Sequence, residues 1–243
     1  MKVLDAHKLY YKELNDIIKA EAPREKEIRI KNVRGQRFIG GTLNEGCTLF
    51  LDGVPGNDMG SFMNGAHIVV SGNAQDGVGN TMNKGEIIIH GHAGDIMGYA
   101  MRGGEIYVKT EVGYRVGIHM KEFGEQIPQL IIGGSAGNFL GEYMAGGVII
   151  VLGIGYSPEE SIGSFCGTGM HGGRIYLRGE IPSYKFGREV KEVALEEEDY
   201  SLLESKVKKY CSYFDYPYEE INLKDFHKFV PKGSRPYGNL YAY

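Results

Sequence analysis

The sequence predicts an all-β fold: a single-stranded right-handed β-helix, a solenoid of about seven coils, with helical flanks at both ends. The first observation is that 34 of the 37 glycines lie between Gly35 and Gly179. The second is that these glycines recur every 19 to 20 residues over much of that stretch, a period typical of stacked supersecondary units. The third is a set of short Ile- and Val-rich runs within the repeats, which favour strands.

Alignment of the repeats on a central glycine sets their register. The central glycines are Gly40, Gly60, Gly79, Gly98, Gly117, Gly141 and Gly167. Three residues later come Leu43, Met63, Met82, Met101, Met120, Met144 and Met170. The residue before each glycine is also apolar. Since Met is interchangeable with Leu, Ile and Val in these columns, we expect its side chains to point inward as core residues rather than to bind a soft metal.

Nineteen residues are too few for a βαβ crossover, which needs about 30 or more. Each coil must therefore turn by corners alone, and glycine suits corners because it reaches positive φ without steric cost. The leucine-rich repeat is the competing solenoid, but its L-x-x-L-x-L pattern is absent.

The predicted segments are an N-terminal helical arm (1–27), the β-helix (28–180) and a C-terminal helix and tail that pack on the rod (181–243). In the arm, residues 5–21 have the pattern of an amphipathic helix with Leu9, Leu14, Ile17 and Ile18 inward.

The second helix is predicted at residues 199–214. Ser201 and Glu204 match a capping box at its start, and Pro217 follows its end. Both helices are expected to cover the ends or one face of the rod, because an open end would expose unpaired strand edges.

Composition excludes several classes of function. The net charge is −4 and no Lys/Arg cluster lies on a repeat face, which argues against nucleic-acid binding. No run of 18 apolar residues and no signal-peptide core is present, so we expect no membrane span. Three widely spaced cysteines argue against a disulfide framework and indicate the reducing cytoplasm.

Two glycine-rich matches resemble catalytic or cofactor motifs. Ser135 lies in a G-x-S-x-G sequence, but a nucleophile elbow needs a following helix, and the next turn of the repeat follows instead. Residues 167–172 match G-x-G-x-x-G, but a strand follows where a dinucleotide site needs a helix N-terminus. Corner glycines explain both, and we expect no catalytic, cofactor-binding or metal-binding residue in the chain.

The histidines are alternative candidates for zinc ligands. His90 and His92 form an H-x-H pair, but His90, His92, His119 and His171 occupy four different columns, whereas a ligand ladder would share one. Cys166 lies in an apolar column and is expected to be a buried, inert thiol.

Two coils are enlarged, and insertions in solenoids tend to mark a binding face. Phe123 lies in the first insertion, and Tyr156 and Pro158 lie in the second. Aromatic residues are enriched among interface anchors, so these three and Tyr237 in the tail are the interface candidates. A tolerated surface loop is the alternative for each insertion.

The repeats also carry a family resemblance. The pattern Gly-x-x-Gly-x-x-x-Gly followed by Met-x-Gly-Gly, at residues 91–104 and 134–147, resembles the GXGXG domain. That domain is the right-handed β-helix at the C-terminal end of the glutamate synthase large subunit. The resemblance covers about residues 25–180. The Asp-Ala-His-Lys arm from Asp5 and the tail at 229–237 resemble a free-standing version of the domain.

The resemblance implies a non-catalytic spacer of a split glutamate synthase, which makes glutamate from glutamine and 2-oxoglutarate. Its partners would be a class II glutaminase subunit and an FMN-dependent synthase subunit. FMN, iron–sulfur clusters and NAD(P)H would reside on the partners, because this chain has neither an N-terminal nucleophilic cysteine nor a cysteine cluster. There are three alternatives. The first is a role like that of the β-helix subunit of formylmethanofuran dehydrogenase or of another amidotransferase–oxidoreductase complex. The others are a hydrolase that uses Ser135 and a homo-oligomeric structural protein.

Overall fold

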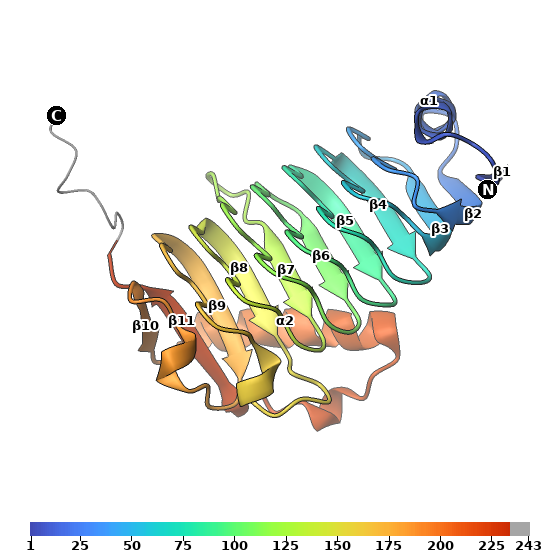
Figure 1. Ribbon diagram of the computed structural model, residues 1–243. Coiled ribbons are helices and arrows are strands. Elements are labelled where there is room, and N and C mark those ends of the chain that lie inside the picture. Colours follow the sequence, from blue (N-terminus) through green and yellow to red (C-terminus); the bar gives the residue numbers. More distant parts are fainter. Residues whose placement is uncertain (234–243) are drawn as a thin grey trace, which may run out of the picture.

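The molecule is a rod of stacked strands with one helix at its end and another along its side (Figure 1). The computed structural model describes residues 1–233. The stacked strands are β1 (Lys2–Asp5), β2 (Glu27–Arg34), β3 (Thr48–Val54), β4 (Asn64–Val70), β5 (Lys84–Ile89), β6 (Glu105–Val108), β7 (Gln129–Ile132), β8 (Ala145–Val151) and β9 (Gly172–Arg178). The flanking elements are α1 (Tyr11–Glu21), β10 (Val190–Val193), α2 (Glu197–Phe214) and β11 (Phe226–Pro231). Short 3-10 helices lie at Glu159–Ser161, Ser183–Lys185, Tyr218–Glu220 and Leu223–Asp225.

Strands β1 to β9 pair in parallel and in sequence order, as a β-solenoid requires. The predicted all-β solenoid is therefore confirmed. It has about six turns, slightly fewer than the seven expected. The register of parallel strands shifts in three pairs, among them β2 and β3, between Ile30 and Val33. At the other end, β11 pairs antiparallel with β9, and β10 forms the edge.

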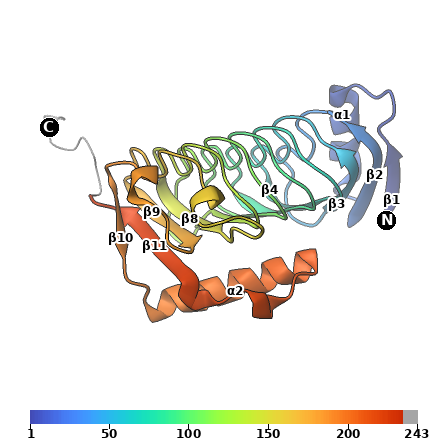
Figure 2. The same cartoon turned by 60° about the horizontal axis from the view of Figure 1, so that its bottom comes forward.

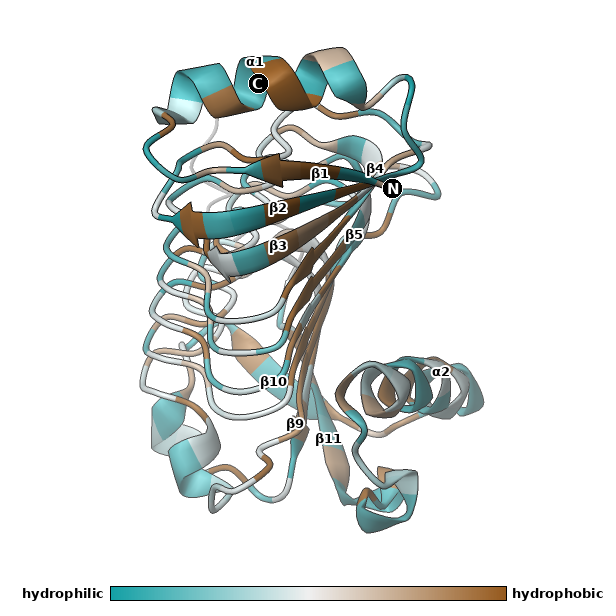
Figure 3. Cartoon of the chain, turned by 90° about the vertical axis from the view of Figure 1, so that its right-hand side faces the viewer, coloured by the Kyte–Doolittle hydropathy of each residue, from teal (hydrophilic) through white to brown (hydrophobic). Residues whose placement is uncertain are grey.

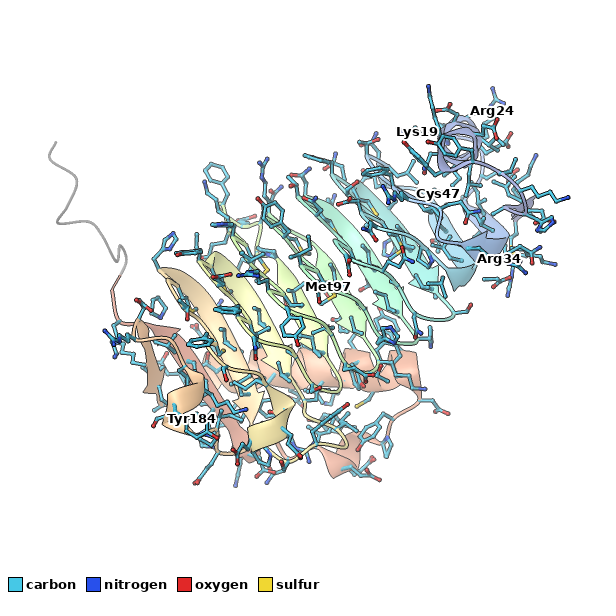
Figure 4. The ribbon with its side chains drawn as sticks, in the orientation of Figure 1. Lys19, Arg24, Arg34, Cys47, Met97 and Tyr184 are labelled. Carbon is cyan, nitrogen blue, oxygen red and sulfur yellow. The ribbon has the colours of Figure 1, made fainter. Side chains whose placement is uncertain are left out.

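The interior of the solenoid is filled by the two apolar columns and by the inward residues of the strands. The predicted inward methionines Met63, Met82, Met101, Met120 and Met144 are all fully buried. The labelled Met97 lies in the middle of the stack of strands (Figure 4), and its side chain is fully buried. The methionine columns are thus core, as predicted.

Each coil turns sharply around its central glycine, a region that we call the central corner. The seven central glycines have φ between 67° and 74°. At Gly60, a Cβ atom would lie 2.6 Å from Cδ1 of Ile87, so close packing as well as backbone conformation favours glycine. The residues two before and two after each central glycine also have positive φ. These flanking positions accept other residues, such as Ile96 and Phe165.

Helix α1 covers the N-terminal end of the solenoid, beside β1 (Figure 3). It begins at Tyr11, so the prediction of a helix from residue 5 was wrong: the chain first forms a strand and then passes through Lys8, whose φ is 63°. A left-handed residue at this point cannot belong to an α-helix.

The buried face of α1 is narrower than predicted. Leu14 and Ile18 are buried and Leu9 is partly buried against the core, but Ile17 is 37% exposed, so its predicted inward position was wrong. Asn15 takes the remaining place on the buried face, and its Nδ2 donates a hydrogen bond to a main-chain carbonyl of the first coil, 2.8 Å away.

Helix α2 lies across the outer face of the sheet (Figure 2). Its Leu203 and Val207 belong to a second apolar cluster with outward residues of β5 to β9. The predicted capping box was misplaced: Glu196 and Asp199 form it, because Ser201 already lies within the helix and its hydroxyl donates to a carbonyl of the first turn.

Candidate partner interfaces

The first predicted interface residue, Phe123, projects from a tight turn before β7. The backbone groups of Phe123 and Gln126 bond to each other in both directions, with N–O distances of 3.1 Å. The turn passes through Gly124, whose φ is 59°. Phe123 is 78% exposed, so this side chain contributes little to the core and is free for a contact.

The second insertion packs partly on the protein itself. Tyr156 is 41% exposed and shares a surface pocket with Tyr210 and Tyr216 at the end of α2. Pro158 lies against Gly179, where a Cβ atom would come within 2.5 Å of its ring. This loop therefore has a structural role beside any role in binding.

The structure does not bring these candidates together. Phe123 precedes the first residue of β7, whereas Tyr156 and Pro158 follow the last residue of β8. Because β7 and β8 are parallel, the first insertion lies at the N-terminal ends of the strands and the second at their C-terminal ends. The fourth candidate, Tyr237, lies outside the described residues.

Sequence reasoning missed a third surface, which we call the aromatic corner: Arg115, His119, Phe139, Tyr143 and Phe165. All five occupy the flanking positions of the central corner and have φ between 50° and 63°. Bulky residues are uncommon in this conformation, and each one costs of order 1–3 kcal/mol. Comparison of the columns two residues before and after the central glycine, in addition to the inward columns, would have revealed this surface.

The side chains of the aromatic corner stack in two ridges along the rod. In one ridge, the Arg115 guanidinium lies 4.8 Å from the centre of the Phe139 ring, which stacks on Phe165 at 5.0 Å. In the other, His119 stacks on Tyr143 at 5.4 Å. Neighbouring coils thus supply successive members of each ridge, which is how a solenoid repeats a surface group.

An ionic network fastens α2 to the sheet near the N-terminal ends of β5 and β6. The carboxylate of Glu105 accepts hydrogen bonds from Lys206 at 2.8 Å, Lys209 at 3.0 Å and the Tyr107 hydroxyl at 2.7 Å. Lys209 also pairs with the buried Glu86. Burial alone would raise the pKa of Glu105, but these donors lower it to about 2.

We therefore expect Glu105→Gln to weaken the fold in a pH-dependent way. The folded pKa lies below the unfolded value near 4.5, so the stabilisation by Glu105 is present above pH 5 and lost as the pH falls toward 2. In urea unfolding, the difference in unfolding free energy between wild type and Glu105→Gln should be large at pH 7 and clearly smaller at pH 3. Glu204→Gln is the control, since its pair with Lys208 is exposed. A difference that does not change with pH would contradict this prediction.

The motifs that resemble catalytic or ligand sites lie in ordinary corner positions. Ser135 lies shortly after β7, and the next element along the chain is strand β8 rather than a helix. Residues 167–172 run directly into β9. Cys166 is fully buried, and burial raises the pKa of its thiol to about 12. Within residues 1–233, no three His, Cys, Asp or Glu side chains gather as a metal site.

The cysteines do not fit an iron–sulfur cluster. Cys47 precedes β3, Cys166 lies in the corner before β9, and Cys211 is on α2, and all three are buried as free thiols. Such a cluster needs about four cysteines that converge on one point. In the part of the chain that the structure describes, no helix is long and apolar enough to cross a membrane.

Comparison with known proteins gives the family. The model of the GXGXG motif family matches residues 7–235. An uncharacterized protein of Methanocaldococcus jannaschii is 44% identical over 253 residues, which is 99% of this chain and 96% of the relative. Among solved structures, a chain of the formyltransferase/hydrolase complex from Methylorubrum extorquens, determined with methylofuran, is similar in fold. Its TM-score is 0.62 at 20% identity, and the match covers 86% of this chain and 84% of that chain. The chain described here belongs to the GXGXG motif family.

Proposed function

We propose that this protein is a structural subunit of a multi-subunit enzyme complex, and that the complex is a split glutamate synthase. In this proposal, the rod holds a class II glutaminase subunit and an FMN-dependent synthase subunit at a fixed separation. The observation that carries the proposal is a family match over almost the whole chain together with a solenoid whose interior holds a continuous set of buried apolar side chains.

A solenoid with an apolar interior suits a spacer better than a catalyst. Its inward columns are buried apolar side chains without reactive groups. Each coil contacts only its neighbours, so the length of the rod is fixed by the number of coils. FMN, iron–sulfur clusters and NAD(P)H are assigned to the partners, in keeping with the separated cysteines.

The exposed insertions are the proposed points of attachment. Phe123, at the N-terminal ends of the strands, and Tyr156, at their C-terminal ends, would suit two different partners. An interface depends mostly on a few aromatic anchors, so removal of one anchor should affect one partner and spare the other.

Co-expression with the glutaminase and synthase subunits of the source organism tests the proposal. We expect both partners to co-elute with the wild-type chain, Phe123→Ala to lose one of them, and Tyr156→Ala to weaken the other. Tyr114→Ala, a change at an exposed tyrosine outside both insertions, is the control. Absence of any stable complex with these subunits would contradict the glutamate synthase assignment.

A second candidate is a subunit of a formyltransferase/hydrolase or formylmethanofuran dehydrogenase complex. The observation that favours it is the fold similarity to the Methylorubrum extorquens chain over most of both chains. The same co-expression with formyltransferase and hydrolase subunits distinguishes the two, because a spacer for one complex should not retain the partners of the other.

A further inference from the structure

The aromatic corner is exposed in a way that the fold does not require. Phe165 is 52% exposed and Tyr143 is 40% exposed. At the corresponding positions, other coils have Gly77 and Gly169, whose backbones adopt the same left-handed conformation without side chains. Bulky rings that are both strained and exposed contribute little to folding, and such exceptions to local preference are expected at functional sites.

The ridge that ends in Phe165 has two different ends. At one end is the guanidinium of Arg115, whose side chain is 49% exposed. At the other end is the phenyl ring of Phe165. The carboxylate of Glu142 is almost buried and already bonds Nε of Arg115 at 2.9 Å. The exposed chemistry of the ridge is thus a cation at one end and an aromatic ring at the other.

Such a surface is complementary to itself when two copies meet in opposite directions. Two copies related by a two-fold axis across the ridge would each place Arg115 against Phe165 of the other, a cation–aromatic contact that is made twice. The same direction in both copies would instead place Arg115 against Arg115. Charge therefore favours the antiparallel arrangement.

We propose that the protein forms a homodimer through the aromatic corner, with the ridges antiparallel and Arg115 of each copy on Phe165 of the other. This inference does not depend on the enzyme partners proposed above. A stable interface buries about 800 Å² on each partner, which is more than five half-exposed side chains supply. We therefore expect a reversible dimer with a dissociation constant of about 10 to 100 μM.

Sedimentation equilibrium of the full chain, from about 1 to 500 μM, tests the proposal with two opposite changes at one residue. Phe165→Arg places a cation opposite Arg115 and should weaken dimerisation at least about tenfold. Phe165→Glu places a carboxylate there and should stay within about threefold of wild type, with a new dependence on salt. Thermal unfolding of each variant checks that the fold is intact.

The matched control is Phe62→Arg, because Phe62 also has positive φ and is 53% exposed but lies outside the aromatic corner. It should leave the dissociation constant unchanged. A wild-type protein that stays monomeric at 500 μM overturns the proposal. So does a dimer that Phe165→Arg leaves intact, since the contact would then lie elsewhere. Equal weakening by Phe165→Arg and Phe165→Glu overturns the antiparallel pairing.

Discussion

Met101→Asp is expected to remove most of the stability of the folded rod. Met101 is fully buried in a column with Met82 and Met120, so the new carboxylate would have no water and no cationic partner. Burial of an unpaired charge costs several kcal/mol, against a total stability of about 5–15 kcal/mol for a folded protein. Thermal unfolding should show a fall in Tm of about 10 °C or more.

Two controls separate charge burial from other causes. Arg102→Asp introduces the same group at the next residue, which is exposed, and should change Tm little. Met101→Leu keeps the apolar volume and should cost less than about 1.5 kcal/mol. In addition, the deficit of Met101→Asp should narrow as the pH falls, because a buried carboxyl has a raised pKa and is accommodated when neutral. A deficit that stays the same from pH 7 to pH 4 would indicate lost packing rather than charge burial.

The repeat made the solenoid predictable because residues at the same position of successive coils point in the same direction and are buried to the same extent. Once the central glycines were aligned, the column containing Met82 and Met101 had to point to one side, and an apolar column in a stack points inward. Strand β3 lacks an Ile- and Val-rich run, because its Leu49 and Leu51 alternate with Phe50 and Asp52. The parallel pairing of β3 with β2 and β4 determines its place.

The covering elements were harder to predict because their partners are distant in sequence. The position of α2 depends on Lys206 and Lys209 reaching Glu105, about a hundred residues earlier. Strand β11 joins β9 in the antiparallel direction, which no repeat signals. Local rules also failed at Ser201, whose hydroxyl bonds within the helix rather than capping it.

The candidate interfaces also divide into one that the sequence revealed and one that it did not. Phe123 was recognised because its insertion interrupts the period. The aromatic corner was overlooked because its residues keep the period and differ only in type, from Gly77 in one coil to Phe139 in another. A surface that follows the repeat becomes visible only when successive coils are stacked in space, where Phe139 and Phe165 lie 5.0 Å apart.

A second large effect is expected at the glycines where each coil enters its next strand. Gly85 has a φ of 109°, and a Cβ atom there would lie 2.3 Å from the carbonyl oxygen of Ala66. That φ is outside the left-handed region near 60° that other residues sometimes adopt, and the clashing atom is backbone, which cannot move without disturbing β4. Gly85→Ala should therefore combine backbone strain with overpacking and cost about 3 kcal/mol or more.

Gly46→Ala separates these two contributions. Gly46 has a similar φ of 104°, but a methyl group added there would have no other atom within 4 Å. It should show the backbone strain alone, about 1 to 2 kcal/mol. Urea unfolding of the two variants under the same conditions gives the difference, which measures the cost of the clash with the neighbouring coil. Equal losses would mean that the stacked coils can separate enough to admit a methyl group, and the rod would then be softer along its axis than a spacer of fixed length requires.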